Sequence, residues 1–166
     1  MREQLKDRDR LQHILDAAGI IMDRTADMNR EGLTEDKVVF YGIVYQTLII
    51  GEAAYKLTKA FCKAHPETPW NQIAKMRHNL VHGYYQVDPD IVWSVILNDL
   101  EPLRAQVARY LDEVDWESWE KNAAVVKETI TNKNLEYTAR RMMSRGYSVE
   151  EIAVITGLPV EDIEML

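Results

Sequence analysis

The chain of 166 residues has little of what builds disulfide-rich, zinc-binding or loop-rich proteins. Its single cysteine, Cys62, cannot form a disulfide within the chain, and no Cys/His cluster has the spacing of metal ligands. Seven glycines and five prolines are few for this length, which favours long helices. The longest apolar run, GIVYQTLIIG, is interrupted by Gln46 and closed by Glu52, so we expect no segment that spans a membrane.

Excess positive charge is also missing. The 27 acidic and 20 basic residues leave a net charge of −7, which argues against a protein that coats nucleic acid by bulk charge. A small local site that acts on RNA is still compatible with this charge. The first residues, MREQLKDRDR, lead into no long apolar segment and do not form a secretory signal, so we expect a cytoplasmic location.

Apolar residues at helical spacing are abundant, and no segment alternates as a strand does. We expect one helix over residues 4–28, a second from a Thr34 cap to residue 64, and a third that follows Thr68 and Pro69 and ends at Gly83. A fourth follows Asp88 over residues 90–114 and should kink or shift its register at Pro102. Short connections between such helices predict an all-α, antiparallel four-helix bundle over residues 1–116.

Residues 117–166 read as a separate helical extension. We expect one more helix, broken near residues 131–134, followed by a hairpin of helix-turn-helix type. Ser148 and Glu151 have the spacing of a capping box, Gly157 ends that helix, and Leu158-Pro159 begins the next. The last helix carries Glu161, Asp162 and Glu164 and no basic residue, so DNA binding is not expected and a docking hairpin is the better interpretation.

The stretch RHNLVHGYY, residues 77–85, concentrates polar and aromatic residues in an otherwise ordinary amphipathic helix. Arg77 and His82 lie five residues apart, so on a straight helix their directions differ by about 140°. They can meet at one phosphate only if the helix ends near Gly83 or if two chains face each other. Arginine binds phosphate and histidine moves protons near neutral pH, a combination that suits RNA cleavage through the ribose 2′-hydroxyl.

A purely structural reading of the same residues stays open at this point. His82 can act as a cation at a helix C-terminus, Arg77 as a surface ion-pair partner, and His78 as a solvated side chain. Tyr84 and Tyr85 can anchor the loop that follows.

Arg77-x4-His82-x-Tyr84 resembles the R-x4-H-x-Y motif of HepT-like proteins, a branch of the HEPN superfamily. The blocks RLQHILDA, IIGEAAYKL, PWNQIAKMRHNLVHGY and VDPDIVW resemble the family in order and spacing, across residues 5–115. The resemblance implies a homodimeric four-helix bundle that acts as a metal-independent endoribonuclease toxin. Its implied partner is a minimal nucleotidyltransferase antitoxin, which uses ATP and Mg²⁺ to attach AMP to the motif tyrosine.

Carried over by position, the resemblance makes Arg77 the phosphate-binding residue and His82 the general acid or base. Asn79 becomes a polar helper within the motif, and Tyr84 the residue that receives AMP, with Tyr85 beside it as an alternative.

Glu52 is a supporting candidate that could orient a motif residue or simply pair with Lys56, and His78 is auxiliary. Neither RNA cleavage nor the site requires a cofactor or metal of its own under this hypothesis.

A second hypothesis of a different class is a non-catalytic binding partner that regulates a nucleotidyltransferase. The net acidity and the C-terminal extension favour this kind of role. RNA cleavage assays of the purified protein, with and without the nucleotidyltransferase, would distinguish the two hypotheses.

Overall fold

The computed structural model describes residues 6–82 and 87–166, without the side chains of residues 78, 79, 81 and 82. All regular secondary structure in these residues is helical, which confirms the predicted all-α class. The chain divides into two compact units, Met1–Val114 and Asp115–Leu166. Each unit is therefore described by itself.

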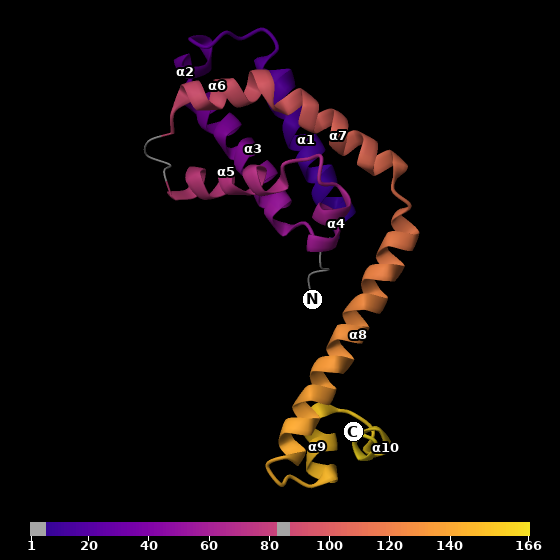
Figure 1. Ribbon diagram of the computed structural model, residues 1–166. Helices are drawn as coiled ribbons and strands as arrows, with labels where there is room; N and C mark the ends of the chain where they lie inside the picture. The colour runs from indigo at the N-terminus through magenta and orange to yellow at the C-terminus, as the bar shows by residue number, and fades with distance from the viewer. Residues whose placement is uncertain (1–5, 83–86) are drawn as a thin grey trace. The chain divides into compact units, whose positions relative to one another are not determined.

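The first unit is a helical bundle in which one helix, α3, packs against two others (Figure 1). Helix α3 (Lys37–Lys56) packs against both α1 (Asp7–Thr25) and α5 (Trp70–His82), and α1 also packs against α7 (Leu100–Glu113). On α1, the apolar residues Leu11, Ile14, Ala18 and Ile21 recur at helical spacing and are buried in this core. The largest fully buried side chains of the unit include Leu11, Ile14 and Ile21 from α1, Leu33, Ile50, Phe61, Leu100 and Val107.

The prediction of one continuous second helix that begins at a Thr34 cap is wrong in both respects. A short helix, α2 (Gly32–Glu35), comes first, and Asp36 rather than Thr34 caps α3, because its carboxylate accepts the amides of Val38 and Val39. The chain then breaks at Leu57, where ψ is 145°, and restarts as α4 (Lys59–Ala64).

Thr58 explains that break. Its hydroxyl caps α4 by accepting the Phe61 amide (3.1 Å) and donates to Asp7 Oδ2 at 2.6 Å, while its own amide donates to Asp7 Oδ1 at 2.8 Å. A buried carboxylate at the start of α1 thus holds the end of α3 in a non-helical conformation. This long-range contact has no signal in the local sequence.

The fourth predicted helix is divided near the proline that was expected to disturb it. Helix α6 (Pro89–Asn98) begins after Asp88, whose carboxylate accepts the Asp90 amide at 2.8 Å, as predicted. The chain turns at Asp99 and continues as α7. Pro102 has no amide hydrogen for the carbonyl four residues earlier, and its ring crowds that carbonyl, which favours the break at Asp99.

The second unit consists of α8 (Trp116–Met143), α9 (Val149–Thr156) and α10 (Val160–Glu164). The predicted capping box of Ser148 and Glu151 forms, and Gly157 ends α9 with a φ of +72°, as the sequence indicated. Its small core contains Ala139, Ile152 and Ile163.

The break predicted within α8 near residues 131–134 is wrong. Helix α8 is continuous through this stretch, where the hydroxyl of Thr131 bonds the carbonyl of Lys127 at 2.9 Å. Thr129 and Thr138 make the same bond to the carbonyl four residues before each of them. These side chains are therefore satisfied within the helix rather than competing with it.

One helix of the described residues is long and apolar enough to cross a membrane by length and composition alone, although the sequence was read as having no apolar run of sufficient length. Helix α3 has 20 residues and contains a window of mean hydropathy 1.3. Of this window, 44% is buried inside the structure, and a central helix of a bundle passes the same test.

Candidate active site

The candidate site lies where α5 crosses α3 at close range. A Cβ atom added to Gly51 of α3 would lie 2.8 Å from Arg77 Cβ and 3.0 Å from the Arg77 backbone nitrogen. Real Cβ atoms essentially never approach so closely, so this crossing requires glycine at position 51. The backbone of α3 therefore determines how deeply the first motif residue is seated.

The Arg77 side chain is held by two neighbours from α3. Its Nε atom forms an ion pair with Glu52 Oε2, and its guanidinium carbon lies 5.3 Å from the centre of the Tyr55 ring. The other carboxylate oxygen of Glu52 lies 3.7 Å from Lys56 Nζ. Both roles considered for Glu52 in the sequence, a contact with a motif residue and a contact with Lys56, thus occur together.

The guanidinium remains accessible while it is held. The Arg77 side chain is 36% exposed and that of Glu52 37% exposed, so the pair lies at the surface of the bundle. Arginine has five N–H donors in a planar fork, and the pair with Glu52 uses the Nε edge. Among the described residues, no ion pair or hydrogen bond occupies the terminal nitrogens, which can bind an anion such as a phosphate.

The structure places the other predicted site residues only in part. Helix α5 is regular through His82, so the backbone positions of Arg77 and His82 differ by about 140° around its axis. The side chains of His78, Asn79 and His82 lie outside the described residues, as do Tyr84 and Tyr85 altogether. Among the predicted residues, the described part of the chain brings together Arg77 and Glu52.

Two contributors to this site, Gly51 and Tyr55, were not singled out from the sequence. Both stand in the block IIGEAAYKL, on either side of Glu52. An isolated glycine inside an apolar helix is a signal for close helix packing, and Gly51 carried that signal. The role of Tyr55 had no such signal, because an exposed tyrosine on a helix is common.

Large apolar side chains line the same exposed face of α3. Val38, Tyr41, Tyr45 and Tyr55 fall with Glu52 within about 100° of the helix circumference. All four of these apolar side chains are more than half exposed, with Tyr45 and Tyr55 each at 61%. Exposed apolar side chains along one face of a helix are typical of an interface.

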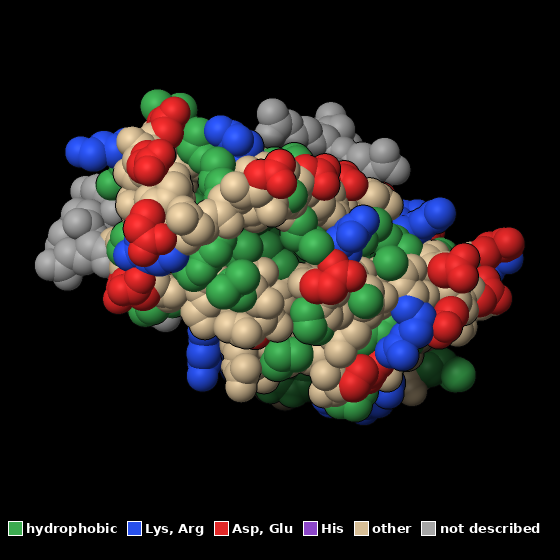
Figure 2. All heavy atoms as spheres, turned by 90° about the horizontal axis from the view of Figure 1, so that it is seen from above, with side chains coloured by type: hydrophobic (Ala, Val, Ile, Leu, Met, Phe, Trp, Pro, Cys, Tyr) green, Lys and Arg blue, Asp and Glu red, His purple; other side chains and the backbone are tan. Residues whose placement is uncertain are grey.

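The remaining surface offers no broad basic area on the face drawn in Figure 2, where acidic and basic side chains of the described residues are interspersed. On this face, an RNA contact would have to rest on local groups rather than on an extended positive field.

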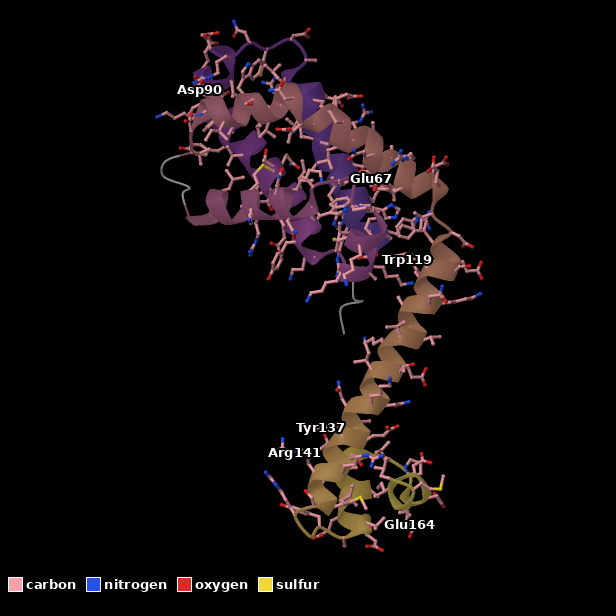
Figure 3. The ribbon with its side chains drawn as sticks, viewed as in Figure 1. Glu67, Asp90, Trp119, Tyr137, Arg141 and Glu164 are labelled. Atoms are coloured by element: carbon pink, nitrogen blue, oxygen red, sulfur yellow. The ribbon has the colours of Figure 1, made fainter. Side chains whose placement is uncertain are left out.

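A second polar cluster joins the loop before α5 to α7, and Figure 3 labels its central residue, Glu67. The Tyr110 hydroxyl donates to Glu67 Oε1 at 2.8 Å, and Arg109 Nη2 donates to the same oxygen at 3.1 Å. Hydrogen bonds from its own backbone amide and from Tyr110 hold the pKa of the Glu67 carboxyl below its ordinary value. Burial raises the pKa of Tyr110, so the phenol stays protonated.

Thr68 was predicted to cap the third helix, but its hydroxyl belongs to this cluster instead. Its hydroxyl donates to Gln106 Oε1 at 2.8 Å and lies 2.7 Å from the Tyr110 oxygen. The cluster fixes the position from which α5 starts, and so supports the site from a distance.

Comparison with known proteins identifies the family of this chain. The model of a family described as ribonuclease HepT-like matches residues 14–110. The chain belongs to the ribonuclease HepT-like family. A provisionally named RNase of Caldanaerobacter subterraneus subsp. tengcongensis is 35% identical over 62% of this chain and 92% of its own length. A protein of Thermococcus cleftensis named as a probable ribonuclease HepT is 31% identical over 60% of this chain and 90% of its own length.

The HepT-like match has clear limits along the chain. It ends at residue 110, within α7, so α8, α9 and α10 lie outside it. No solved structure matches the chain. The HepT-like part of the molecule is thus the bundle that contains Arg77 and Glu52.

Proposed function

We propose that this chain is an endoribonuclease toxin that works in the cytoplasm as a homodimer. The observation that supports this most is the position of Arg77, seated on Gly51, held by Glu52 and still accessible, at the first position of the R-x4-H-x-Y motif. The provisional RNase names of its relatives agree with this activity.

The proposed reaction uses the substrate's own nucleophile. The ribose 2′-oxygen attacks the adjacent phosphorus and loses its proton to a base, and the bond from phosphorus to the 5′-oxygen breaks as that oxygen takes up a proton. A 2′,3′-cyclic phosphate and a 5′-hydroxyl result. His82 transfers protons, and Arg77 stabilises the negative charge that grows on the phosphorane, so the chemistry needs no metal ion. DNA lacks the 2′-hydroxyl and is not cleaved.

A homodimer solves the geometric problem posed by α5. On one helix Arg77 and His82 diverge by about 140°, but two helices facing each other can bring one chain's Arg77 to the other's His82. The exposed stripe of Val38, Tyr41 and Tyr45 beside the site gives a second copy an apolar surface to cover. Asn79 would add a polar contact in the same cleft.

A nucleotidyltransferase partner would silence the site by transferring AMP from Mg²⁺-bound ATP to the hydroxyl of Tyr84, or of its neighbour Tyr85. The new bond joins the tyrosine oxygen to the α-phosphorus as the bond to the β-phosphate breaks, so pyrophosphate and the phenolic proton are released. The added phosphate carries a negative charge into the cleft, where it would occupy Arg77 and block the path of RNA. The mass of protein co-expressed with such a partner, with the adduct mapped by peptide analysis, tests this part of the proposal.

The first test of the nuclease is cleavage of RNA by purified protein. Arg77→Ala and His82→Ala should each lower kcat by at least about 100-fold, because each removes charge stabilisation or proton transfer from the transition state. Arg104→Ala is the matched control, since Arg104 is a half-exposed arginine on α7 that pairs only with Glu101 among the described residues. Circular dichroism checks that all three variants fold, and unchanged cleavage by both site variants would refute the nuclease.

A non-catalytic partner that regulates a nucleotidyltransferase is the second candidate. It is favoured by the net charge of −7 and by a C-terminal unit that the family match does not include. Here the protein would cleave no RNA in any state but would change the transferase's rate of ATP use. Assays of both activities, with the two proteins apart and together, separate the candidates.

A further inference from the structure

Three arginines lie close together in sequence at the end of α8, although the unit around them is acidic. Residues 115–166 contain ten acidic and six basic residues, a net charge of −4, yet three of those basic residues are Arg140, Arg141 and Arg145. Arg140 donates to the backbone carbonyl of Leu166. Arg141 and Arg145 have no carboxylate partner among the described residues, so their charges remain available.

These two arginines line a shallow groove of about 350 Å³ together with two exposed tyrosines, Tyr137 and Tyr147, and with Ile155. The Arg141 guanidinium lies 5.9 Å from the centre of the Tyr137 ring, and both side chains lie on the same side of α8 (Figure 3). Tyr137 is 62% and Tyr147 is 47% exposed. No acidic side chain lines this groove.

Two acidic residues of the unit line a different hollow. A second hollow, on the side of α8 that faces α10, is lined by Glu136 and Asp162. Helix α8 therefore separates an arginine–tyrosine groove from an acidic one, within a unit that is acidic overall.

We infer that the Arg141–Arg145 groove binds the backbone of single-stranded RNA, and this inference rests on the proposed nuclease function. Guanidinium groups bind phosphate through paired N–H donors, and exposed aromatic rings stack unpaired bases whatever their sequence. The groove combines both elements at the scale of one or two nucleotides. It would strengthen binding of the substrate without taking part in the reaction.

Single-stranded RNA fits this groove better than a duplex or an acidic protein does. Duplex bases stay stacked on each other and cannot use the tyrosine rings, and a net charge of −7 disfavours electrostatic binding of two strands. An acidic protein would use the arginines but leave the two exposed rings without a role.

The test measures RNA affinity in the full-length chain with His82→Ala added to stop cleavage. The probe is a 20-nucleotide single-stranded RNA, labelled with fluorescein and followed by anisotropy at several salt concentrations. Arg141→Gln/Arg145→Gln should weaken binding and lower the slope of log K against log salt by about 1.4, the value for two phosphate contacts on a single strand. Tyr137→Leu/Tyr147→Leu should weaken binding about fivefold or more.

Lys127→Gln/Lys133→Gln is the matched control, because it removes two exposed positive charges from the same helix outside the groove. It should leave the affinity within twofold and the salt slope unchanged. The side chains substituted in the second unit are all exposed, so this unit keeps its core in every variant.

The outcomes separate this inference from the nuclease proposal. In the chain with His82 intact, the arginine variant should raise KM and leave kcat unchanged. If the wild-type chain cleaves RNA but the arginine and lysine variants have the same RNA affinity and the same salt slope, the groove is overturned and the nuclease is not. Loss of RNA binding in the arginine variant of a chain that cleaves no RNA supports the groove and overturns the nuclease. A loss confined to binding of a nucleotidyltransferase partner assigns the groove to protein and also overturns the inference.

Discussion

The guanidinium of Arg77 is fixed along one edge and open along the other. Glu52 takes the Nε edge, and the Tyr55 ring lies beside the group at 5.3 Å, while the side chain stays 36% exposed. An arginine held in this way loses less conformational freedom when it binds a phosphate than a mobile one does. The carboxylate should thus position Arg77 more than it competes with the substrate.

Removing the carboxylate tests that balance. Glu52→Ala should lower the kcat for RNA cleavage by about tenfold, because a misplaced charge stabilises the transition state less well. Lys56→Ala is the control, since it removes only the contact of Lys56 with Glu52 at 3.7 Å. Steady-state kinetics on both variants decide the point, and equal rates for the two would show that Glu52 is only a surface ion-pair partner.

The pKa of Glu67 leads to a prediction on stability and pH. Its pKa is lower in the folded chain than the ordinary value of 4.5, so its carboxylate stabilises the fold above pH 4.5 and this contribution is lost as the pH falls through the lowered value. The free energy of unfolding of Glu67→Gln should lie below that of the wild type at pH 7, and the difference should shrink in acid. Urea titrations between pH 3 and 7 measure it, with Glu101→Gln as the exposed control.

The chemistry of the motif could be predicted from the residues more readily than its geometry. Arg77 and His82 suit phosphate and proton transfer, but their spacing on one helix separates them, so it was the flanking blocks that indicated a shared site. The ion pair of Arg77 with Glu52 joins residues 25 positions apart on different helices. Local spacing cannot reveal such a pair before the packing of α3 on α5 is known.

At the scale of helices, caps made by neighbouring residues were predictable and those made by distant ones were not. Ser148 with Glu151 and Gly157 act within one turn, so their pattern is visible in the sequence. The end of α3 depends on Asp7, which lies 51 residues before Thr58 and accepts its amide and hydroxyl. A hydrophobic pattern that continues through Leu57 therefore predicted one long helix where there are two.

The crossing of α3 and α5 gives a prediction with an internal control. Gly51→Ala should destabilise the bundle by about 1–3 kcal/mol, because the new methyl group would meet the backbone of Arg77 at about 3 Å and force the helices apart. Gly42→Ala lies on the same helix with nothing within 4 Å of the added carbon. It should stabilise the chain by about 0.5–1 kcal/mol through helix propensity. Thermal and urea unfolding measure both, and equal stability would exclude the close packing.

For the whole molecule, the family match and the division into two units agree in placing the site in the bundle. The match covers residues 14–110, inside the unit Met1–Val114. The 103 matched residues amount to 92% of the C. subterraneus relative, so a chain of about bundle length occurs without an extension like this one. The second unit has its own core around Ala139, Ile152 and Ile163.

Deleting residues 115–166 should leave a folded bundle. Its buried apolar side chains among the described residues, from Leu11 to Tyr110, all lie before the cut. The shortened protein should keep its helical circular dichroism, unfold cooperatively and retain the kcat of the full chain, and its KM for RNA should rise as the arginine–tyrosine groove is lost. A shortened protein that fails to unfold cooperatively would show that the bundle depends on the second unit.

The contact between Gly51 and Arg77 also has a genetic consequence. If expression of the chain arrests growth, a selection for surviving cells would recover changes at Gly51 as well as at Arg77, because a side chain at position 51 displaces the motif. The two classes of survivor would differ in protein abundance, since a packing defect exposes the chain to proteolysis and the loss of one surface arginine does not. A survivor's immunoblot could therefore distinguish a damaged fold from a damaged active site before any protein is purified.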